Sequence, residues 1–235
     1  MKFPKRHFKS PFLLPVVAAF FLLIYLGVSL IDWSDEVTLR FTIIQDRDVY
    51  EESDYGEPPQ IAIWLEDTLT GKPRTVYVTR RTAKGDFEGK VECPVSLPIW
   101  IGTFRGEFHR EDFPTVRDPA PSAITRATRK RKRITARVRV PPFSCWRYFI
   151  EMNVAGDYNF TYTRMGDGYK PDYHGNGQPS IVYSGMIFAE DGNTSSPELI
   201  GRSRQHQFTT GIIRDLKGIH SAGEVFKAIE VICRD

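Results

Sequence analysis

The sequence predicts a mainly β protein, an immunoglobulin-like antiparallel β-sandwich preceded by one N-terminal transmembrane helix. Residues 12–31 form an unbroken apolar run, and residues 133–140 alternate between apolar and polar side chains. No amphipathic helical pattern alternates with the segments that resemble strands. A parallel α/β sheet needs such helices between its strands, so an antiparallel sandwich is the favoured class.

The apolar run 12–31 has the length of a membrane span, because about 20 helical residues cross a hydrocarbon core of roughly 30 Å. The tail 1–11 before it is basic, and acidic residues follow it. Under the positive-inside rule the tail is cytoplasmic. We therefore predict a single-pass membrane protein with a signal-anchor at 12–31 and a periplasmic or extracellular domain at 32–235.

A cleaved signal peptide is the alternative to a permanent anchor. The apolar run is longer than the usual h-region of 7–15 residues, and no A-x-A-like cleavage site follows it. These features favour the uncleaved anchor. Both interpretations place the remainder of the chain outside the cytoplasm.

The charge balance argues against a nucleic-acid partner. The formal net charge is +3 at pH 7, and part of it belongs to the basic tail 1–11. The exported part is therefore close to neutral, whereas nucleic-acid-binding domains are strongly basic. The densest basic cluster, residues 126–133, is interpreted as a solvated loop that leads into a strand, with attraction to anionic headgroups as the alternative.

Three cysteines, Cys93, Cys145 and Cys233, stand in the exported part. In an oxidising compartment we expect one disulfide between two of them and one free thiol, with the pairing left open. The chain has no C-x-x-C motif and no Cys/His pair at ligand spacing, so no metal site is predicted.

Apolar alternation and turn residues place the expected strands. The linker around Gly71 and Pro73 predicts a hairpin between the second strand and the third. Ser221 and Glu224 have the spacing of a capping box, which predicts a short helical turn before the final strand. The expected strands are residues 37–45, 60–66, 74–80, 133–140, 146–154, 180–189 and part of 225–233.

The strand at 133–140 is expected to have one buried face and one wet face. Ile134, Ala136, Val138 and Val140 fall on one side of it. Thr135, Arg137 and Arg139 fall on the other side and face water.

Two long irregular stretches, residues 82–132 and 163–178, are the predicted contact surfaces. Structureless loops of this length are uncommon in compact domains unless they carry function. Aromatic residues dominate binding hot spots, so we predict aromatic anchors for a partner in these loops. The predicted anchors are Trp100, Phe104, Phe108, Tyr169 and Tyr173.

Several short motifs resemble, in order, an uncharacterised family of predicted periplasmic β-sandwich domains that is often associated with flavin-transferase systems. They are W-L-E-D at 64–67, S-A-I-T-R-A-T at 122–128, E-M-N at 151–153, D-Y-N at 157–159 and G-Q-P-S-I-V-Y at 177–183. The resemblance implies that Thr128 would accept FMN through phosphate. Ser122 replaces the family's Asp and Arg126 replaces its Gly, and an Arg side chain where Gly permits close backbone approach disfavours flavin attachment.

The predicted function is therefore non-catalytic: recognition or assembly with another envelope protein, without a cofactor. The sequence shows no G-x-S-x-G, H-E-x-x-H, Walker or dinucleotide motif. The alternative is an accessory domain of an extracytosolic flavin or redox system, with covalent FMN on Thr128. A glycan hydrolase would need paired carboxylates across a cleft, and 82–132 shows no obvious pair.

Overall fold

The computed structural model describes residues 36–85, 96–127, 132–165, 172, 175–206 and 209–235. Residues 37–235 form one compact unit. The predicted tail 1–11 and membrane run 12–31 lie outside the described residues. Within the described ranges, no helix combines the length and the apolar character that a membrane span requires.

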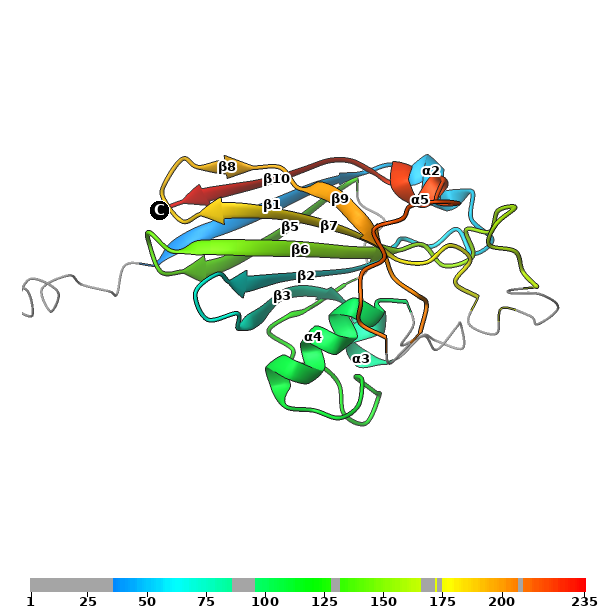
Figure 1. The fold of residues 1–235 in the computed structure, drawn as a ribbon, viewed down its shortest axis with the longest axis horizontal. Coiled ribbons are helices and arrows are strands. Elements are labelled where there is room, and N and C mark those ends of the chain that lie inside the picture. Colours follow the sequence, from blue (N-terminus) through cyan, green and yellow to red (C-terminus); the bar gives the residue numbers. More distant parts are fainter. Residues whose placement is uncertain (1–35, 86–95, 128–131, 166–171, 173–174, 207–208) are drawn as a thin grey trace, which may run out of the picture. The chain divides into compact units, whose positions relative to one another are not determined.

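Two β-sheets form this unit (Figure 1). The four-stranded sheet has the order β5-β1-β10-β8, and the six-stranded sheet has the order β4-β3-β2-β6-β7-β9. All neighbouring strands pair antiparallel except β3 and β4. The strands of the first sheet are β1 (Val37–Gln45), β5 (Arg133–Val140), β8 (Thr194–Ser195) and β10 (Phe226–Arg234). Those of the second are β2 (Gln60–Asp67), β3 (Pro73–Thr79), β4 (Thr125–Arg126), β6 (Cys145–Asn153), β7 (Ile181–Phe188) and β9 (Glu198–Arg202).

The predicted β-rich sandwich is confirmed, and its main strands lie where the alternation placed them. The bounds of β1 and β5 coincide with the predicted strands, those of β3, β6 and β7 differ by one residue at each end, and β2 is one residue longer at its end. The predicted hairpin is the antiparallel pair β2–β3. The predicted helical turn is α5 (Ser221–Glu224), directly before β10, but its N-cap is His220 and makes no side-chain cap hydrogen bond, so the predicted capping box is not formed. Strands β4, β8 and β9 were not predicted.

The main core lies between the two sheets. Leu39, Phe41 and Ile43 of β1 are fully buried, and they share one cluster with Tyr148 and Ile150 of β6. The rings of Phe41 and Tyr148 meet edge to face with 5.6 Å between their centroids. Alternate side chains of β1 and β5 supply one wall of this core, because successive residues of a strand point to opposite faces.

The six-stranded sheet is covered on its second face as well, by α4 (Pro98–Phe108) (Figure 1). Ala62 and Trp64 of β2 and Val78 of β3 pack there against Trp100 and other residues of the helix. This explains why β2 reads as a continuous apolar segment: six consecutive residues from its start are buried. A strand that is covered on both faces loses the alternation of a half-exposed one.

The expectation of a structureless loop over residues 82–132 is therefore wrong. The region contains the 11-residue helix α4 and the short strand β4, and α3 (Arg80–Lys84) runs into its start. Helix α4 begins with Pro98 in its first turn, where the missing N–H costs nothing, and ends at His109 in the left-handed conformation. A further short helix, α2 (Arg47–Glu51), follows β1 and begins at the capping side chain of Asp46.

Candidate functional site

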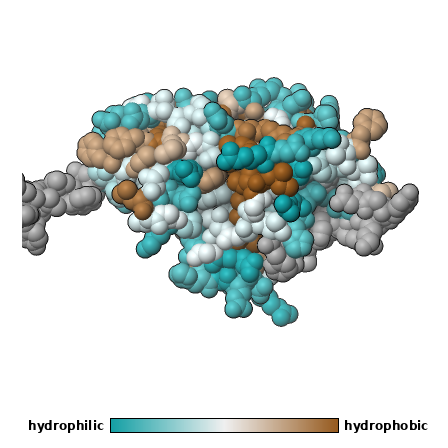
Figure 2. Space-filling model, viewed as in Figure 1, coloured by the Kyte–Doolittle hydropathy of each residue, from teal (hydrophilic) through white to brown (hydrophobic). Residues whose placement is uncertain are grey.

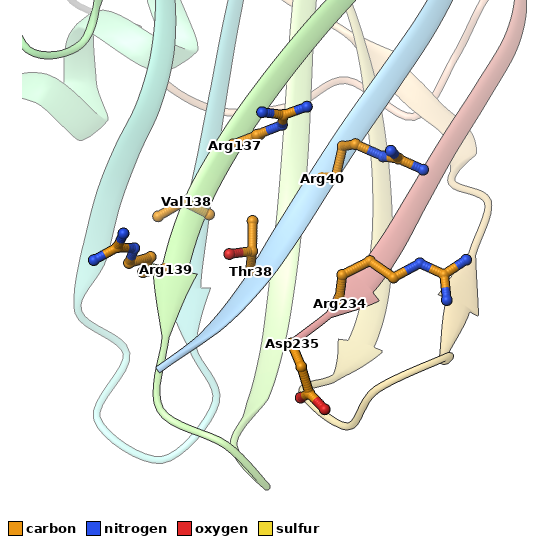
Figure 3. Close-up of a pocket in the computed structure, with 7 residues that line it drawn as sticks. All are labelled: Thr38, Arg40, Arg137, Val138, Arg139, Arg234 and Asp235. Carbon is orange, nitrogen blue, oxygen red and sulfur yellow. The ribbon is translucent and has the colours of Figure 1, made fainter. Parts of the chain in front are cut away.

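Four arginines lie on the outer face of the four-stranded sheet, and together we call them the arginine face: Arg40, Arg137, Arg139 and Arg234 (Figure 3). Strand geometry puts them there. Side chains along β5 alternate between exposed and buried, with the arginines on the exposed side. On β1 the residues at even positions face outward in the same way, so Thr38 and Arg40 lie between the arginines of the neighbouring strands.

The register of the strands brings these residues into adjacent rows. Arg40 of β1 pairs directly with Arg137 of β5. Thr38 pairs with Arg139 on one side and with Arg234 of β10 on the other. Paired residues on one face of an antiparallel sheet have Cβ atoms about 5 Å apart. The register therefore places arginines of three strands at neighbouring positions on one face of the sheet.

The arginine face lines a shallow, open pocket of about 480 Å³. In Figure 3 the guanidinium groups extend from three strands around Thr38. Asp235 next to Arg234 is the acidic residue of the lining. The lining consists of Thr38, Arg40, Arg137, Val138, Arg139, Arg234 and Asp235.

The charges of the arginine face are not neutralised by neighbouring carboxylates. Among the described residues, none of the four guanidinium groups takes part in an ion pair. The Nε of Arg40 is buried and has no hydrogen-bond partner in the described part of the chain. Like charges placed directly opposite each other destabilise a sheet, and a buried donor without an acceptor costs further free energy. An anion bound here would relieve both costs.

Guanidinium groups in this arrangement suit a phosphate or carboxylate ligand. Each presents a planar fork of donors that can bind two oxygen atoms at once, and charge-assisted hydrogen bonds are stronger than neutral ones. The pocket is open, and its residues are arginine, threonine and valine apart from Asp235. These residues offer groups that can bind an anion.

A second polar cluster is buried behind the six-stranded sheet, and Glu151 of β6 is its centre. The Glu151 carboxylate accepts hydrogen bonds from the backbone N–H of Ile99 at 3.3 Å and of Trp100 at 2.7 Å. It also accepts one from the Ser180 hydroxyl at 2.6 Å. The Leu97 N-cap of α4 makes no side-chain cap hydrogen bond, so Glu151 caps the helix from a distant strand. Burial raises the pKa of Glu151 to about 7.

Asp157 and Gln178 form the other half of this cluster. The Gln178 backbone N–H donates to Asp157 Oδ1 at 2.8 Å, and the Gln178 side-chain amide donates to Asp157 Oδ2 at 2.9 Å. The same amide donates to the Ser221 hydroxyl, and its oxygen accepts from the His220 N–H. Burial raises the pKa of Asp157 to about 8. These contacts join the chain segments around β6, β7 and α5, which is a structural role.

The motifs E-M-N, D-Y-N and G-Q-P-S, far apart in the sequence, therefore meet in one hydrogen-bonded network. Asn153 donates to the Gln178 carbonyl at 3.1 Å, and Asn159 donates to the Gly218 carbonyl at 2.8 Å. The motif residues that contact one another support the fold.

The prediction that Trp100 and Phe104 anchor a partner is wrong, because both side chains are fully buried. Their rings pack together with 5.2 Å between centroids, in the second core under α4. Phe108, one turn further, is half-buried against the same core. The three aromatics share one face of α4 at a spacing of four residues and hold the helix on the sheet.

Several predicted residues lie outside the part of the chain that the structure describes: Tyr169, Tyr173, Thr128 and Cys93. Of the predicted disulfide partners, Cys145 and Cys233 are both free thiols, so the pair Cys145–Cys233 is not formed. Cys233 is buried in the main core, where it packs as a small apolar residue.

Two of the four residues of the arginine face could be recognised from the sequence. Its alternation placed Arg137 and Arg139 on the wet side of their strand, but it did not connect them with Arg40 or Arg234. The alternation of residues 37–45 carries the signal for Arg40. The pairing of β1 with both β5 and β10 joins the four, and no local pattern reveals that pairing.

Comparison with known proteins adds no relative. No family model matches the chain, and neither a curated protein nor a solved structure matches it.

Proposed function

We propose that this protein is a membrane-anchored, extracytoplasmic recognition domain that binds an anionic envelope component through the arginine face. The anchor is the apolar run 12–31, and the domain belongs to the immunoglobulin-like class of sandwiches in this proposal. Its location is periplasmic or extracellular. The protein does not act as an enzyme, and its role is recognition or assembly.

The arginine face is the observation that carries this proposal. Four arginines with no ion-pair partner in the described chain line one pocket on the outer face of the four-stranded sheet. Like charges directly opposite each other cost stability, and a bound anion would offset this cost. The matching partner presents phosphate or carboxylate groups, as an acidic protein surface or a phosphate-bearing polymer does. Within the described residues, nothing favours the alternative of covalent FMN.

A titration with two anionic probes tests the proposal. The full chain in detergent is titrated with labelled polyphosphate and with labelled poly-glutamate, and the comparison tells phosphate from carboxylate recognition. Each lost charge-assisted bond weakens binding by roughly tenfold or more. We expect the double variant Arg40→Gln with Arg137→Gln to bind the preferred probe at least roughly tenfold more weakly than the wild type. Binding by the wild type should weaken steeply as salt is added.

Arg117→Gln is the matched control, because Arg117 is exposed, follows α4 in the chain and is not part of the arginine face. It should leave the affinity unchanged. Equal affinities of the double variant, the control and the wild type for both probes would contradict the proposal.

A further inference from the structure

We propose that the end of the sandwich where β1 begins rests on the membrane surface, with Leu69, Phe143 and Phe188 inserted among the lipid headgroups. We call these three residues the apolar tips. The inference rests on the proposed membrane anchor and adds to it a fixed orientation of the domain. The partner is a lipid surface.

The apolar tips are unusually exposed for their residue types. Leu69 is 94% exposed, Phe143 71% and Phe188 42%. Figure 2 shows light-brown hydrophobic residues at the left end of the domain, the end that carries these turns in Figure 1. Exposed apolar side chains that gather at one place mark an interaction site, whereas single ones need no explanation.

Phe143 and Phe188 are in ring contact, and the turn that carries Leu69 is tied to the start of β6, although the three residues come from two turns and the end of β7. The rings of Phe143 and Phe188 lie with their centroids 6.4 Å apart. The Phe143 N–H donates to the Ala189 carbonyl at 2.7 Å. The Thr68 hydroxyl, next to Leu69, donates to the Cys145 carbonyl at 2.9 Å. The tips therefore form one surface.

Phe143 is held outward by a backbone conformation that bulky residues avoid. Its φ is +58°, in the left-handed region. The turn between β5 and β6 keeps it there through hydrogen bonds with Ala189 on both sides: Phe143 N–H to Ala189 O and Ala189 N–H to Ser144 O. A residue held in such a conformation costs free energy, and such residues cluster at functional sites.

The chain enters the domain at the same end. Val37, the first residue of β1, pairs with Val140, three residues before Phe143. Residues 32–36 alone separate β1 from the apolar run 12–31. A link of five residues spans at most about 18 Å. This end of the sandwich is therefore within reach of the bilayer if residues 12–31 cross it.

The apolar tips favour a lipid surface as the partner, because their side chains can insert into it while the nearest arginines contact headgroups. A phenylalanine transferred from water to an apolar environment favours the docked form by on the order of tenfold. Arg139 precedes Phe143 by four residues, and Arg234 precedes Asp235, whose N–H donates to Asp191 close after Phe188, so both arginines lie near this end and can bind headgroup phosphates. Glu190, Asp191 and Asp235 stand at the same end, so net charge alone does not drive docking. The rest of the arginine face stays free for a lateral partner.

The opposite end of the sandwich provides an internal control. Phe160 is fully exposed there, in the segment after Asp157. The nine residues of β1 separate the two ends by about 30 Å. A Phe160 side chain is thus as apolar as Phe143 and more exposed, but lies far from the surface on which the apolar tips would rest.

Photo-crosslinking in lipid nanodiscs tests the inference on the full chain. Phe143, Phe188 or Phe160 is replaced by p-benzoylphenylalanine, and adducts are identified by mass spectrometry in phosphatidylglycerol and in phosphatidylcholine nanodiscs. We expect lipid adducts at 143 and 188, on the order of tenfold above the yield at 160. A higher yield in phosphatidylglycerol would assign part of the docking to the arginines.

Replacement of Phe20, inside the apolar run, by p-benzoylphenylalanine tests the anchor separately from the docking. Lipid adducts at 20 together with equal yields at 143 and 160 would overturn the docking and leave the anchor intact. Absence of lipid adducts at 20 would overturn the anchor itself. Protein adducts at 143 and 188 in place of lipid adducts would show that a second copy or a partner covers the tips, which also overturns the inference.

Discussion

The outer faces of the two sheets meet different surroundings. Helix α4 covers the outer face of β2 and β3, and the contact combines apolar side chains with the buried polar residues Thr75 and Glu151, which hydrogen-bond to the helix. The outward side chains of β5 remain exposed, and most of them are arginines. Outward side chains of the strands thus pack against a helix on one sheet and remain exposed to solvent on the other. The difference indicates which face maintains the fold and which face is available to a partner.

Truncation of a buried side chain under α4 should have the largest effect on the free energy of unfolding. Trp100→Ala removes a fully buried ring from the contact between α4 and the sheet and should lower the free energy of unfolding by about 3–5 kcal/mol. Urea unfolding of the full chain in detergent, followed by tryptophan fluorescence and circular dichroism, measures this. Arg137→Ala on the exposed face is the control. A cost below about 1 kcal/mol for Trp100→Ala would mean that α4 is not part of the stable core.

The cap of α4 predicts a pH dependence of stability. The pKa of Glu151 is about 7 in the folded chain, against an ordinary value of 4.5. Between these values the unfolded chain releases the proton while the folded chain keeps it, so stability falls as pH rises from 4.5 to 7. The contribution lost over this window is on the order of 2–3 kcal/mol.

Glu151→Gln isolates this contribution, because glutamine does not titrate. The variant loses an acceptor for the Trp100 or Ile99 N–H and should be less stable than the wild type at pH 4.5. The gap between the two should narrow as pH rises to 7, measured as melting temperature against pH. A gap that stays constant would show that Glu151 does not titrate in this window.

Substitution on the exposed face should have the smallest effect on stability. Arg40→Gln with Arg137→Gln removes a directly opposed pair of like charges and should change the free energy of unfolding by about 0–1 kcal/mol, in the stabilising direction. The difference should shrink at high salt, since salt screens the repulsion. Thermal unfolding at low and high salt measures both. Destabilisation by several kcal/mol would indicate that these arginines maintain the fold.

The strands could be predicted because their residues follow local rules. Residues 37–45 and 133–140 alternate, and the alternation reflects one buried and one exposed face. Helix α4 could not be predicted in this way. Gly102 lowers its helix propensity, and the Thr210 side chain lies where a Cβ of residue 102 would be. Its cap, Glu151, comes from a strand far along the chain, so tertiary contacts stabilise it.

The candidate site was predictable only in part, for a related reason. The wet face of β5 follows from the alternation, but the arginine face also requires the pairing of β1 with β10, the last strand of the domain. The aromatic residues misled the prediction of contact surfaces. Trp100 and Phe104 are as suitable for a core as for a partner, and burial decides between the two.

Recovery of partners from native membranes tests the central claim most directly. The wild type, Arg40→Gln with Arg137→Gln, and Arg117→Gln are crosslinked in their own envelope, purified and analysed by quantitative mass spectrometry. We predict an anionic component that is recovered with the wild type and with Arg117→Gln and is strongly depleted with the double variant. The same set of partners at equal yield for all three proteins would contradict a recognition role for the arginine face.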